Sequence, residues 1–376
     1  MTNPDRPRVV VVGGGYGGTA VARALDEQTA VVLVDPKDSF VHFVGALRAV
    51  TDPEWTSRIF FSYDRLLVHG RVVRDHAVSV ESGRVVLGSG DVLAADFVVL
   101  ASGSRYPFPA KTDDTDTADA VARYRAAHDI VAAADRILLI GAGPVGIELA
   151  GELAHAWPHK QITLLDVLPE VMGTGMQIRD DLKTSLRAQL EERGVRLVLG
   201  SPLTSPPPTA PAEAGAFEVV TEAGDTIAAD VWFQCWGVRP ASDYLSGELG
   251  AARRPDGSVE VTPELRVVGQ ERVFALGDVT AGYPKMASTA NRQAELVAAN
   301  ILALVHGQEL TAYAAPGMAI VVPIGPFGGA GQSPDRDELM GPDVVSQAKG
   351  QALRTDFYAE RFGVELPPTG REAGPT

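Results

Sequence analysis

The sequence contains the same local pattern twice, and this duplication constrains the fold more than any other feature. Each copy has a run of β-branched and aliphatic residues, a glycine-rich turn, a stretch of small residues and a second apolar run that ends in aspartate. The turns begin at Gly13 and Gly141, and the closing acids are Asp35 and Asp166. A buried strand, a tight turn, a helix and a parallel strand form a βαβ unit. Because the turns are 128 positions apart, too far for a solenoid repeat, the sequence predicts two separate α/β domains.

Each predicted domain carries an inserted antiparallel segment. Residues 71–100 alternate between apolar and polar around two Ser-Gly pairs, which predicts a meander that ends in a strand at 97–100. Residues 217–237 alternate in the same way around a Gly-Asp turn. The expected fold class is therefore α/β, with two Rossmann-like dinucleotide-binding domains of three layers (ββα). Each domain has an inserted antiparallel β-meander, and a short C-terminal region follows.

The first domain is predicted to be discontinuous in sequence. Its two parts are expected at residues 7–110 and 263–317, and the second domain lies between them at 111–262. Residues 318–376 form the short C-terminal region, whose Pro/Gly-rich tail is expected to be disordered. Its apolar residues between 344 and 362 have partly helical spacing and few unopposed cations, which favours packing on the protein over docking on a membrane surface.

The first glycine turn has the spacing of a dinucleotide-binding fingerprint. Gly13 permits the tight turn, Gly15 lets backbone N–H groups approach a pyrophosphate, and Gly18 lets helix and strand pack closely. Asp35 follows Gly15 by 20 residues, a distance that suits a carboxylate accepting hydrogen bonds from a ribose diol. The alternative is a structural turn beside a surface aspartate, but the flanking strand and helix favour dinucleotide binding.

The second turn repeats the fingerprint and predicts which nucleotide it prefers. Gly141-Ala-Gly-Pro-Val-Gly146 precedes a helix, and Asp166 closes the next strand. The three residues after Asp166 are Val, Leu and Pro. An adenosine 2′-phosphate would meet a carboxylate and no adjacent cation there, so we expect NADH to be preferred over NADPH.

Three short blocks resemble the two-dinucleotide-binding flavoprotein reductases, the pyridine nucleotide–disulfide oxidoreductase superfamily. Gly141–Glu148 resembles the NAD fingerprint of that family, Val98–Ser104 resembles the strand and turn that close its first meander, and Val273–Asp278 resembles its second flavin-binding motif. The resemblance extends over residues 7–310. It implies one tightly held FAD and one exchanging NADH, with hydride transfer between them.

Further stretches resemble a narrower branch, the apoptosis-inducing-factor-like and ferroptosis-suppressor-like NAD(P)H:quinone oxidoreductases, which lie near the type II NADH dehydrogenases. These stretches are residues 35–42 with 46–48, then 106–109 and 284–287. The branch implies a quinone or a similar small molecule as electron acceptor. The sequence departs from the family pattern at Trp236, where Thr or Ser is usual, so the indole is expected to reshape the nicotinamide or acceptor pocket.

Motifs and resemblance together define the candidate site. The residues expected to bind FAD are Gly13, Gly15, Tyr16, Gly17, Gly18, Asp35, Pro36, Lys37, Ala101, Ser102, Gly103, Gly277, Asp278, Lys285, Met286 and Ala287. The residues expected to bind NAD(H) are Gly141, Gly143, Pro144, Val145, Gly146, Glu148, Asp166, Trp236 and Gly237. The residues expected at the reacting centre are Glu148, Lys285, His42 and Lys349.

Several of these residues have a simpler interpretation. His42 is a proton relay to the reduced acceptor or a structural histidine, and Lys349 binds an acceptor or is a solvated surface lysine. Tyr106 and Phe108 stack on adenine or only pack. A glutamate at position 148 also suits the first turn of a helix for dipole reasons alone.

Composition excludes other classes of protein. One cysteine, Cys235, cannot form an internal disulfide or a CxxC redox pair, and we expect a buried small hydrophobe there. The net charge of −15 argues against nucleic-acid binding. No apolar run is long enough to span a membrane, the N-terminus lacks a signal pattern, and Thr2 excludes N-myristoylation there. We expect a cytoplasmic protein with at most weak peripheral membrane contact, either monomer or homodimer, and the Ala/Gly/Arg/Pro-rich composition suggests a bacterial source. A ferredoxin or rubredoxin reductase, a tailoring flavoenzyme of specialised metabolism and a slow-turnover NADH sensor remain as alternatives.

Overall fold

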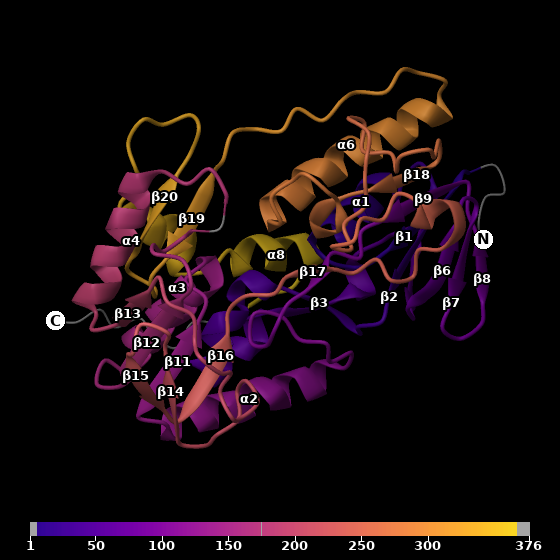
Figure 1. The fold of residues 1–376 in the computed structure, drawn as a ribbon. Helices are drawn as coiled ribbons and strands as arrows, with labels where there is room; N and C mark the ends of the chain where they lie inside the picture. Colours follow the sequence, from indigo (N-terminus) through magenta and orange to yellow (C-terminus); the bar gives the residue numbers. More distant parts are fainter. Residues whose placement is uncertain (1–5, 174, 367–376) are drawn as a thin grey trace.

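Two parallel sheets organise the protein, one for each duplicated βαβ unit (Figure 1). The structure is a computed structural model that describes residues 6–173 and 175–366. The first sheet has the strand order β18-β9-β1-β2-β5, and the second has the order β13-β12-β11-β16. The first sheet comprises β1 Arg8–Val12, β2 Ala30–Asp35, β5 Arg71–Arg74, β9 Phe97–Leu100 and β18 Val273–Ala275. The second comprises β11 Arg136–Ile140, β12 Gln161–Asp166, β13 Arg196–Leu199 and β16 Val231–Gln234.

Helices and smaller strands surround these sheets. The α-helices are α1 Tyr16–Leu25, α2 Thr117–Ala133, α3 Pro144–Ala156, α4 Asp180–Glu192, α5 Gly247–Gly250, α6 Ala287–Val305, α7 Pro342–Val345 and α8 Thr355–Phe362. The smaller strands are β3 Ser39–Val41, β4 Phe60–Ser62, β6 Ala77–Glu81, β7 Arg84–Leu87, β8 Val92–Ala94, β10 Ser104–Arg105, β14 Phe217–Val220, β15 Thr226–Ala229, β17 Arg239–Pro240, β19 Ile320–Pro323 and β20 Gly329–Gln332. The short 3₁₀ and π-helical turns are η1 Phe43–Val50, η2 Pro53–Arg58, η3 Tyr63–Arg65, η4 Gly277–Val279 and the π-turn η5 Ser346–Gly350.

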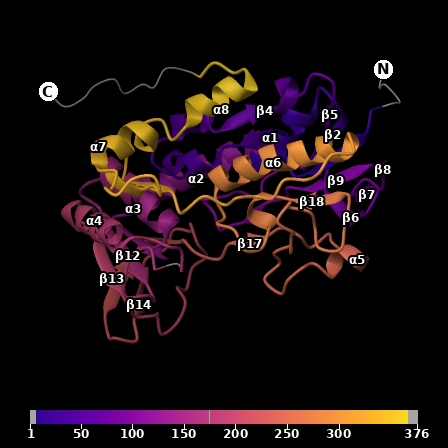
Figure 2. The same cartoon turned by 90° about the horizontal axis from the view of Figure 1, so that it is seen from above.

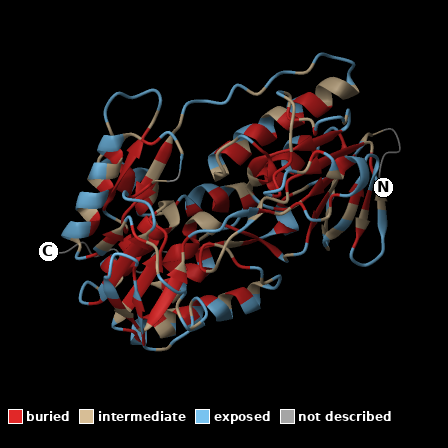
Figure 3. Ribbon diagram, viewed as in Figure 1, coloured by how far each residue is buried: buried red, intermediate tan, exposed pale blue. Residues whose placement is uncertain are grey.

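Alternation along β1 produces the three layers of the first domain. Val9 and Val11 belong to the core that α1 and α6 cover, whereas Val10 and Val12 belong to the core beneath the meander β6-β7-β8. Successive side chains of a strand point to opposite faces, so both faces of this all-apolar strand are buried. Buried residues accordingly fill the strands and the inner sides of the helices (Figure 3). The predicted ββα arrangement is confirmed.

The second sheet follows the same rule. Ile137 and Leu139 pack on the side of α3 and α4, while Leu138 and Ile140 pack under the hairpin β14-β15. The first domain is completed by a late return of the chain, since β18 pairs in parallel with β9 and α6 lies beside α1 (Figure 2). The exact domain boundaries stay a prediction.

Two details of the sequence prediction are wrong. Arg71–Arg74 does not belong to the meander, because β5 pairs in parallel with β2 at the edge of the main sheet. The second insertion is a two-strand hairpin rather than a meander, because the apolar run Val231–Gln234 pairs in parallel with β11 instead. Alternation marks a half-exposed strand, but it does not identify the strand's partner.

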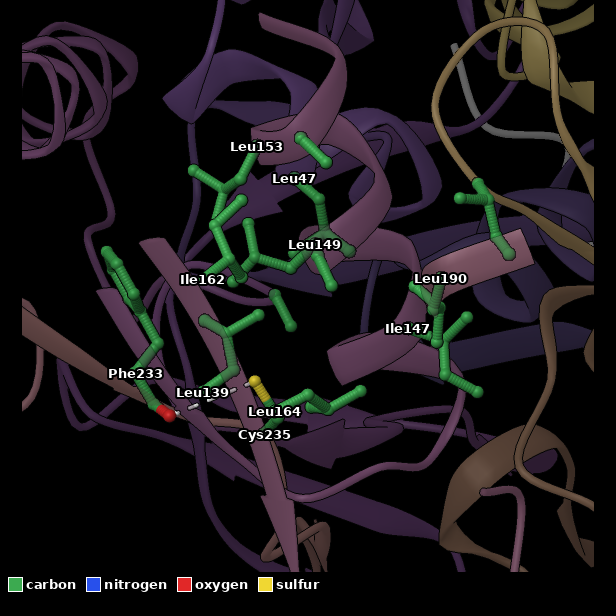
Figure 4. Close-up of a cluster of buried hydrophobic side chains, with 14 of the residues drawn as sticks. Leu47, Leu139, Ile147, Leu149, Leu153, Ile162, Leu164, Leu190, Phe233 and Cys235 are labelled. Atoms are coloured by element: carbon green, nitrogen blue, oxygen red, sulfur yellow. Dashed lines mark hydrogen bonds between the residues drawn. The ribbon is translucent and has the colours of Figure 1, made fainter. Parts of the chain in front are cut away.

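One apolar core joins the two halves of the chain. Leu47 of η1 packs with Leu149 and Leu153 of α3 in the cluster that also contains Cys235 (Figure 4). Five larger apolar side chains lie between residues 345 and 362, and four of them are buried: Val345, Leu353, Tyr358 and Phe362. The exception is Phe357, which is 48% exposed. Packing of this segment against the protein is therefore confirmed, and residues 367–376, where a disordered tail was predicted, lie outside the described residues.

Candidate active site

A single large cavity of about 2230 Å³ joins the two duplicated turns. Residues of both turns line it, together with the start of α6, the η5 turn and α8. Every residue proposed from the sequence for cofactor binding or chemistry lines this cavity except Gly18 and Gly146. Those two are the third glycines of the fingerprints, whose expected role is to let a helix approach a strand. The structure thus brings the predicted residues together from segments more than 300 positions apart in sequence.

The first turn is shaped by backbone contacts that only glycine permits. A Cβ at Gly13 would lie 2.4 Å from the Ala101 carbonyl oxygen, and one at Gly18 would lie 1.7 Å from the Gly13 carbonyl oxygen. Gly13 also has a φ of +106°. A Cβ at Gly15, in contrast, would meet no protein atom within 4 Å, although Gly15 lines the cavity. Open space at this second glycine fits the pyrophosphate of a bound dinucleotide.

Asp35 holds the same turn in place through hydrogen bonds to its backbone. Its two carboxylate oxygens accept hydrogen bonds from the backbone N–H groups of Gly14 (2.6 Å) and Lys37 (2.8 Å). Burial raises the pKa of Asp35, and these two hydrogen bonds oppose that rise. The Tyr63 hydroxyl donates to the Gly14 carbonyl at 2.9 Å and closes the turn from the other side. A carboxylate oxygen can accept more than one hydrogen bond, so Asp35 retains capacity for a ribose diol.

The second turn repeats this geometry in a more open setting. Asp166 accepts hydrogen bonds from the N–H groups of Ala142 (2.6 Å) and Leu168 (2.9 Å). Val167 and Leu168 beside it are 57% and 39% exposed. Within residues 6–173 and 175–366, no Lys, Arg or His forms an ion pair with Asp166. Among these residues, the Asp166 carboxylate therefore lines the cavity without an ion-pair partner.

Two lysines lie close to the Gly277-Asp278 block. The Asp278 carboxylate accepts a hydrogen bond from the Ser104 hydroxyl (2.6 Å) and lies 3.3 Å from the Lys111 ammonium. Lys285 donates to the Asp278 backbone carbonyl at 2.7 Å, and burial lowers its pKa. The sequence analysis missed Lys111. Its position seven residues after Ser104 carries no motif, and only the crossover that returns it to Ser104 places it in the site.

Glu148 and Lys349 form an ion pair at the wall of the cavity. The ammonium of Lys349 lies 2.7 Å from Glu148 Oε1, and the side chains are only 19% and 13% exposed. Burial raises the pKa of Glu148, while the charge and hydrogen bond of Lys349 lower it. The sequence left open whether Lys349 is a solvated surface lysine. Its low exposure and its ion pair show that it is not. Its partner is 201 positions away, and the pairing is decided by the fold.

His42 is fully buried, and both its ring nitrogens have partners. Nε2 lies 2.7 Å from the Leu353 carbonyl, and Nδ1 lies 3.1 Å from the Tyr16 hydroxyl. Desolvation lowers the pKa of His42 to about 4. The ring is thus neutral at physiological pH, with Nε2–H donating to the carbonyl and Nδ1 accepting from Tyr16. This arrangement favours the structural interpretation, because His42 ties the flavin-side domain to the C-terminal segment.

The loop after β16 presents Trp236 to the cavity. Trp236 is 47% exposed, and Cys235 before it is buried, where desolvation raises the pKa of its thiol to about 12. The Tyr106 hydroxyl donates to the Cys235 carbonyl at 2.6 Å, which anchors this loop to the first domain. Phe108 does not line the cavity and packs on Tyr124 at a ring distance of 5.0 Å. The expectation of a buried cysteine is confirmed, and Phe108 packs rather than stacks on a ligand.

Fold and site together define a class of protein: one that holds two dinucleotides in a common cavity on paired Rossmann-like domains. The sequence matches the family described as "Pyridine nucleotide-disulphide oxidoreductase" over residues 7–294. The chain belongs to this family, and it is an FAD-dependent NAD(P)H oxidoreductase.

Named relatives extend over nearly the whole chain. Ferroptosis suppressor protein 1 of Taeniopygia guttata is 31% identical over 367 residues, which cover 96% of this chain and 97% of the relative. The sulfide:quinone oxidoreductase of Aquifex aeolicus superposes with a TM-score of 0.75 at 17% identity, covering 96% of this chain and 93% of the other. NDH2 of Plasmodium falciparum, solved in complex with NADH, gives a TM-score of 0.72 at 11% identity, with coverage of 96% and 100%. At 17% and 11% identity, the two structures show only that the fold is similar.

Two properties of the described residues bear on alternative roles. Among the described residues, no helix combines the length and the hydropathy that crossing a bilayer requires. In the same part of the chain, no cluster of three or more His, Cys, Asp or Glu side chains has the arrangement of a metal site.

Proposed function

We propose that this protein oxidises NADH through bound FAD and reduces a quinone or a similar small acceptor. The observation that carries the proposal is the single cavity into which both fingerprint turns and the Glu148–Lys349 pair open. A shared cavity lets two bound dinucleotides meet at their reactive ends, and proximity of this kind is the main contribution a protein makes to hydride transfer. The resemblance of residues 35–42, 106–109 and 284–287 to the NAD(P)H:quinone oxidoreductases supports the choice of acceptor, and the similarity to ferroptosis suppressor protein 1 agrees with that branch.

The first turn is proposed to hold FAD. The N–H groups of α1 and the free space at Gly15 suit its pyrophosphate, and Asp35 suits the adenosine ribose. Asp278, held by Ser104 and Lys111, would bind the polar chain between ribose and ring. The N-terminus of α6, preceded by Lys285, brings positive potential to the far end of the cavity. When bound, FAD supplies a two-electron acceptor and donor, which no side chain of this protein supplies.

The second turn is proposed to hold NADH next to Glu148. Asp166 would accept the adenosine ribose hydroxyls, and its lack of an adjacent cation disfavours the 2′-phosphate of NADPH. Glu148 is the cavity-lining acid on the second turn of the helix after this fingerprint, so it is placed to orient the nicotinamide end. The first turn of α3 contains no acidic residue, so Glu148 does not have the first-turn position that the helix-dipole alternative requires. Burial raises the pKa of Glu148, and the charge and hydrogen bond of Lys349 oppose that rise, so Lys349 favours the ionised form and adds a cation close to the proposed reacting centre.

Anaerobic stopped-flow absorbance tests the proposal. Mixing the FAD-bound protein with NADH is expected to bleach the flavin band quickly, and NADPH is expected to bleach it more slowly. Adding a short-chain quinone to the reduced protein should restore the band faster than dissolved oxygen does. A flavin that binds but stays oxidised with both nucleotides would contradict the proposal, and rapid reoxidation by ferredoxin but not by quinone would redirect it to a carrier-protein reductase.

We also propose that the protein works in the cytoplasm as a monomer or homodimer, with at most peripheral membrane contact. The cavity rim supports such contact only weakly, because Phe357 is its one exposed aromatic side chain on α8 and the acidic residues Asp356 and Glu360 flank it. Flotation with anionic vesicles and light scattering after gel filtration test these two points. The bacterial source suggested by composition stays a prediction.

A further inference from the structure

A second buried ion pair holds the segment that carries Lys349. Arg48 in η1 donates to both carboxylate oxygens of Glu152 in α3, from Nε to Oε2 at 2.9 Å and from Nη2 to Oε1 at 2.7 Å. The two side chains are 7% and 5% exposed. The guanidinium also lies over the Trp55 ring, 4.7 Å from its centroid. This planar, two-pronged contact has one defined geometry, unlike the contact of a flexible lysine.

The same guanidinium binds the end of the η5 turn. Arg48 donates to the carbonyl oxygens of Gly350 and Gln351, each at 2.6 Å. These residues directly follow Lys349. Gly350 ends the turn Ser346–Gly350, which has π-helical geometry, and Gln351 caps it. A Cβ at Gly350 would lie 2.6 Å from the Pro326 carbonyl oxygen, so the turn is packed closely on its other side as well. Arg48 thus connects three segments that are far apart in sequence: η1, α3 and the C-terminal region.

The two ion pairs share one helix. Glu148 and Glu152 are four residues apart on α3 and therefore lie on the same face. Lys349 binds the first glutamate and Arg48 binds the second, while Arg48 also holds the backbone next to Lys349. Because one rigid helix carries both glutamates, fixing the η5 backbone to Glu152 fixes the origin of the Lys349 side chain relative to Glu148. Leu47, next to Arg48, packs against α3 and secures η1 in the same core (Figure 4).

We propose that Arg48 is a positioning residue that holds the Lys349 ammonium against Glu148 in the NADH-facing wall of the cavity. This inference rests on the proposed function for its catalytic consequence. Arg48 does not line the cavity, so it acts through Lys349 and not by touching a ligand. A lysine side chain has four rotatable bonds, and its ammonium keeps one position only when its backbone is fixed. The sequence analysis gave no role to Arg48 or to Glu152.

The test variant must change the position of the Lys349 ammonium without destabilising the protein and without changing the net charge near Glu148. Removing one partner would bury an unpaired charge, whereas replacing both with apolar side chains of similar volume is often neutral for stability. R48M/E152M meets this requirement. It also removes two opposing influences on Glu148, since Glu152 raises the pKa of Glu148 and Arg48 lowers it.

The first readout is a mutant cycle in stopped-flow reduction. The limiting rate of flavin reduction at saturating NADH is measured for the wild type, R48M/E152M, K349M and the triple variant. We expect R48M/E152M to slow reduction by about 10- to 100-fold, as a misplaced group at a reacting centre does. In the K349M background the same change should slow it by no more than about twofold, because the positioned group is already absent. Equal losses in both backgrounds, or no loss in the first, would overturn the inference.

The second readout does not depend on activity. Brief acetylation of the FAD-bound proteins, followed by mass spectrometry, reports how readily each lysine leaves its partner. Labelling of Lys349 is expected to rise about tenfold in R48M/E152M, while labelling of Lys183, on α4 and outside the cavity, stays unchanged. Unchanged labelling of Lys349 would overturn the proposal even if the enzyme were slow. A wild type that NADH does not reduce would instead contradict the proposed function and leave this readout intact.

Two further variants control for general destabilisation and for failure of the double variant to fold. Leu186 is fully buried in α4 and does not line the cavity, so L186A destabilises the domain without moving Lys349. If L186A slows reduction as much as R48M/E152M does, the effect is general destabilisation and the proposal fails. If R48M/E152M does not accumulate with FAD bound, R48K takes its place in both readouts, because lysine keeps the charge but cannot bind Glu152 and the two carbonyls together.

Discussion

The two fingerprint turns have the same backbone plan but different surroundings. In both, an aspartate at the end of the second strand accepts a hydrogen bond from the residue after the first glycine, at 2.6 Å. In the first turn that residue is Gly14, whose Cβ would lie 2.4 Å from the Tyr63 hydroxyl. In the second turn the equivalent residue is Ala142, whose methyl group is buried in the apolar core of that half of the protein.

Asp35 is also more buried than Asp166. Asp35 is 9% exposed, and its neighbour Lys37 is held by the carbonyl oxygens of Thr112 (2.8 Å) and Asp114 (2.5 Å). Asp166 is followed by the exposed residues Val167 and Leu168. An enclosed turn suits a cofactor that stays bound, and an open turn suits one that exchanges at each turnover. The motif defines what binds, and the residues packed around it determine how long it stays.

The largest expected effect comes from adding one methyl group to the third glycine of each turn. A Cβ at Gly18 or Gly146 would lie 1.7 or 1.9 Å from a backbone carbonyl oxygen, so either change costs about 3 kcal/mol or more. We expect G18A to be purified without flavin, and G146A to remain yellow but unreduced by NADH. Flavin absorbance per protein and stopped-flow reduction measure the two outcomes. Equal loss of flavin in both variants would break the distinction between a permanent and an exchanging site.

The buried histidine beside the first turn predicts that the stability of the protein depends on pH. The pKa of His42 is about 4 in the folded protein and 6.5 unfolded, so its stabilising contribution is present above pH 6.5 and is lost as the pH falls towards 4. Between pH 7 and pH 5 this group should cost the wild type about 2 kcal/mol of unfolding free energy. Urea unfolding at both pH values should show a correspondingly smaller loss in H42Q. If both proteins lose the same amount, His42 is not the group responsible.

Neutralising each acid sharpens the comparison further. D166N is expected to raise the KM for NADH about tenfold while the flavin stays bound, since a hydrogen bond to a charged group is lost. D35N should instead raise the dissociation constant of FAD by about the same factor, with little change in the KM for NADH. Steady-state kinetics and flavin titration of the apoprotein distinguish these results. Crossed effects would show that the two turns do not serve separate nucleotides.

The smallest expected effect concerns the choice of nucleotide at the open turn. V167R places a cation at an exposed position next to Asp166, where an adenosine 2′-phosphate would lie. We expect kcat/KM for NADPH to rise about fivefold, because exposed ion pairs contribute roughly 1 kcal/mol or less. V92R, at an exposed position in the meander and outside the cavity, is the matched control. A gain of the same size in V92R would point to general electrostatic attraction instead.

Most of the fold could be predicted because it depends on local patterns. The strand at 97–100, both fingerprint turns and the strands and helices that flank these turns follow from apolar runs and glycine spacing. The meander was misjudged at Arg71–Arg74 because its alternation is that of any half-exposed strand. The partner of an edge strand depends on hydrogen bonds to distant residues, and the local sequence does not encode them.

The candidate site likewise contains residues that local sequence patterns predict and residues that they do not. Gly13, Asp35, Gly141 and Asp166 were found because the phosphate and ribose chemistry requires fixed spacings along one βαβ unit. Lys111 was missed, and the role of Lys349 was left open, because their partners Asp278 and Glu148 are 167 and 201 positions away.

By itself, then, the sequence determined that the chain has two dinucleotide-binding fingerprints, and it predicted which residues hold each phosphate and ribose, since those contacts are expected within single βαβ units. Only the tertiary structure decided that both turns share one cavity, that Glu148 is paired with Lys349 and that Arg48 anchors the η5 turn. The physical reason is that an isolated buried charge is unstable, so each buried glutamate of α3 requires a cation. Which cation meets it depends on how α3, η1 and the C-terminal region pack together.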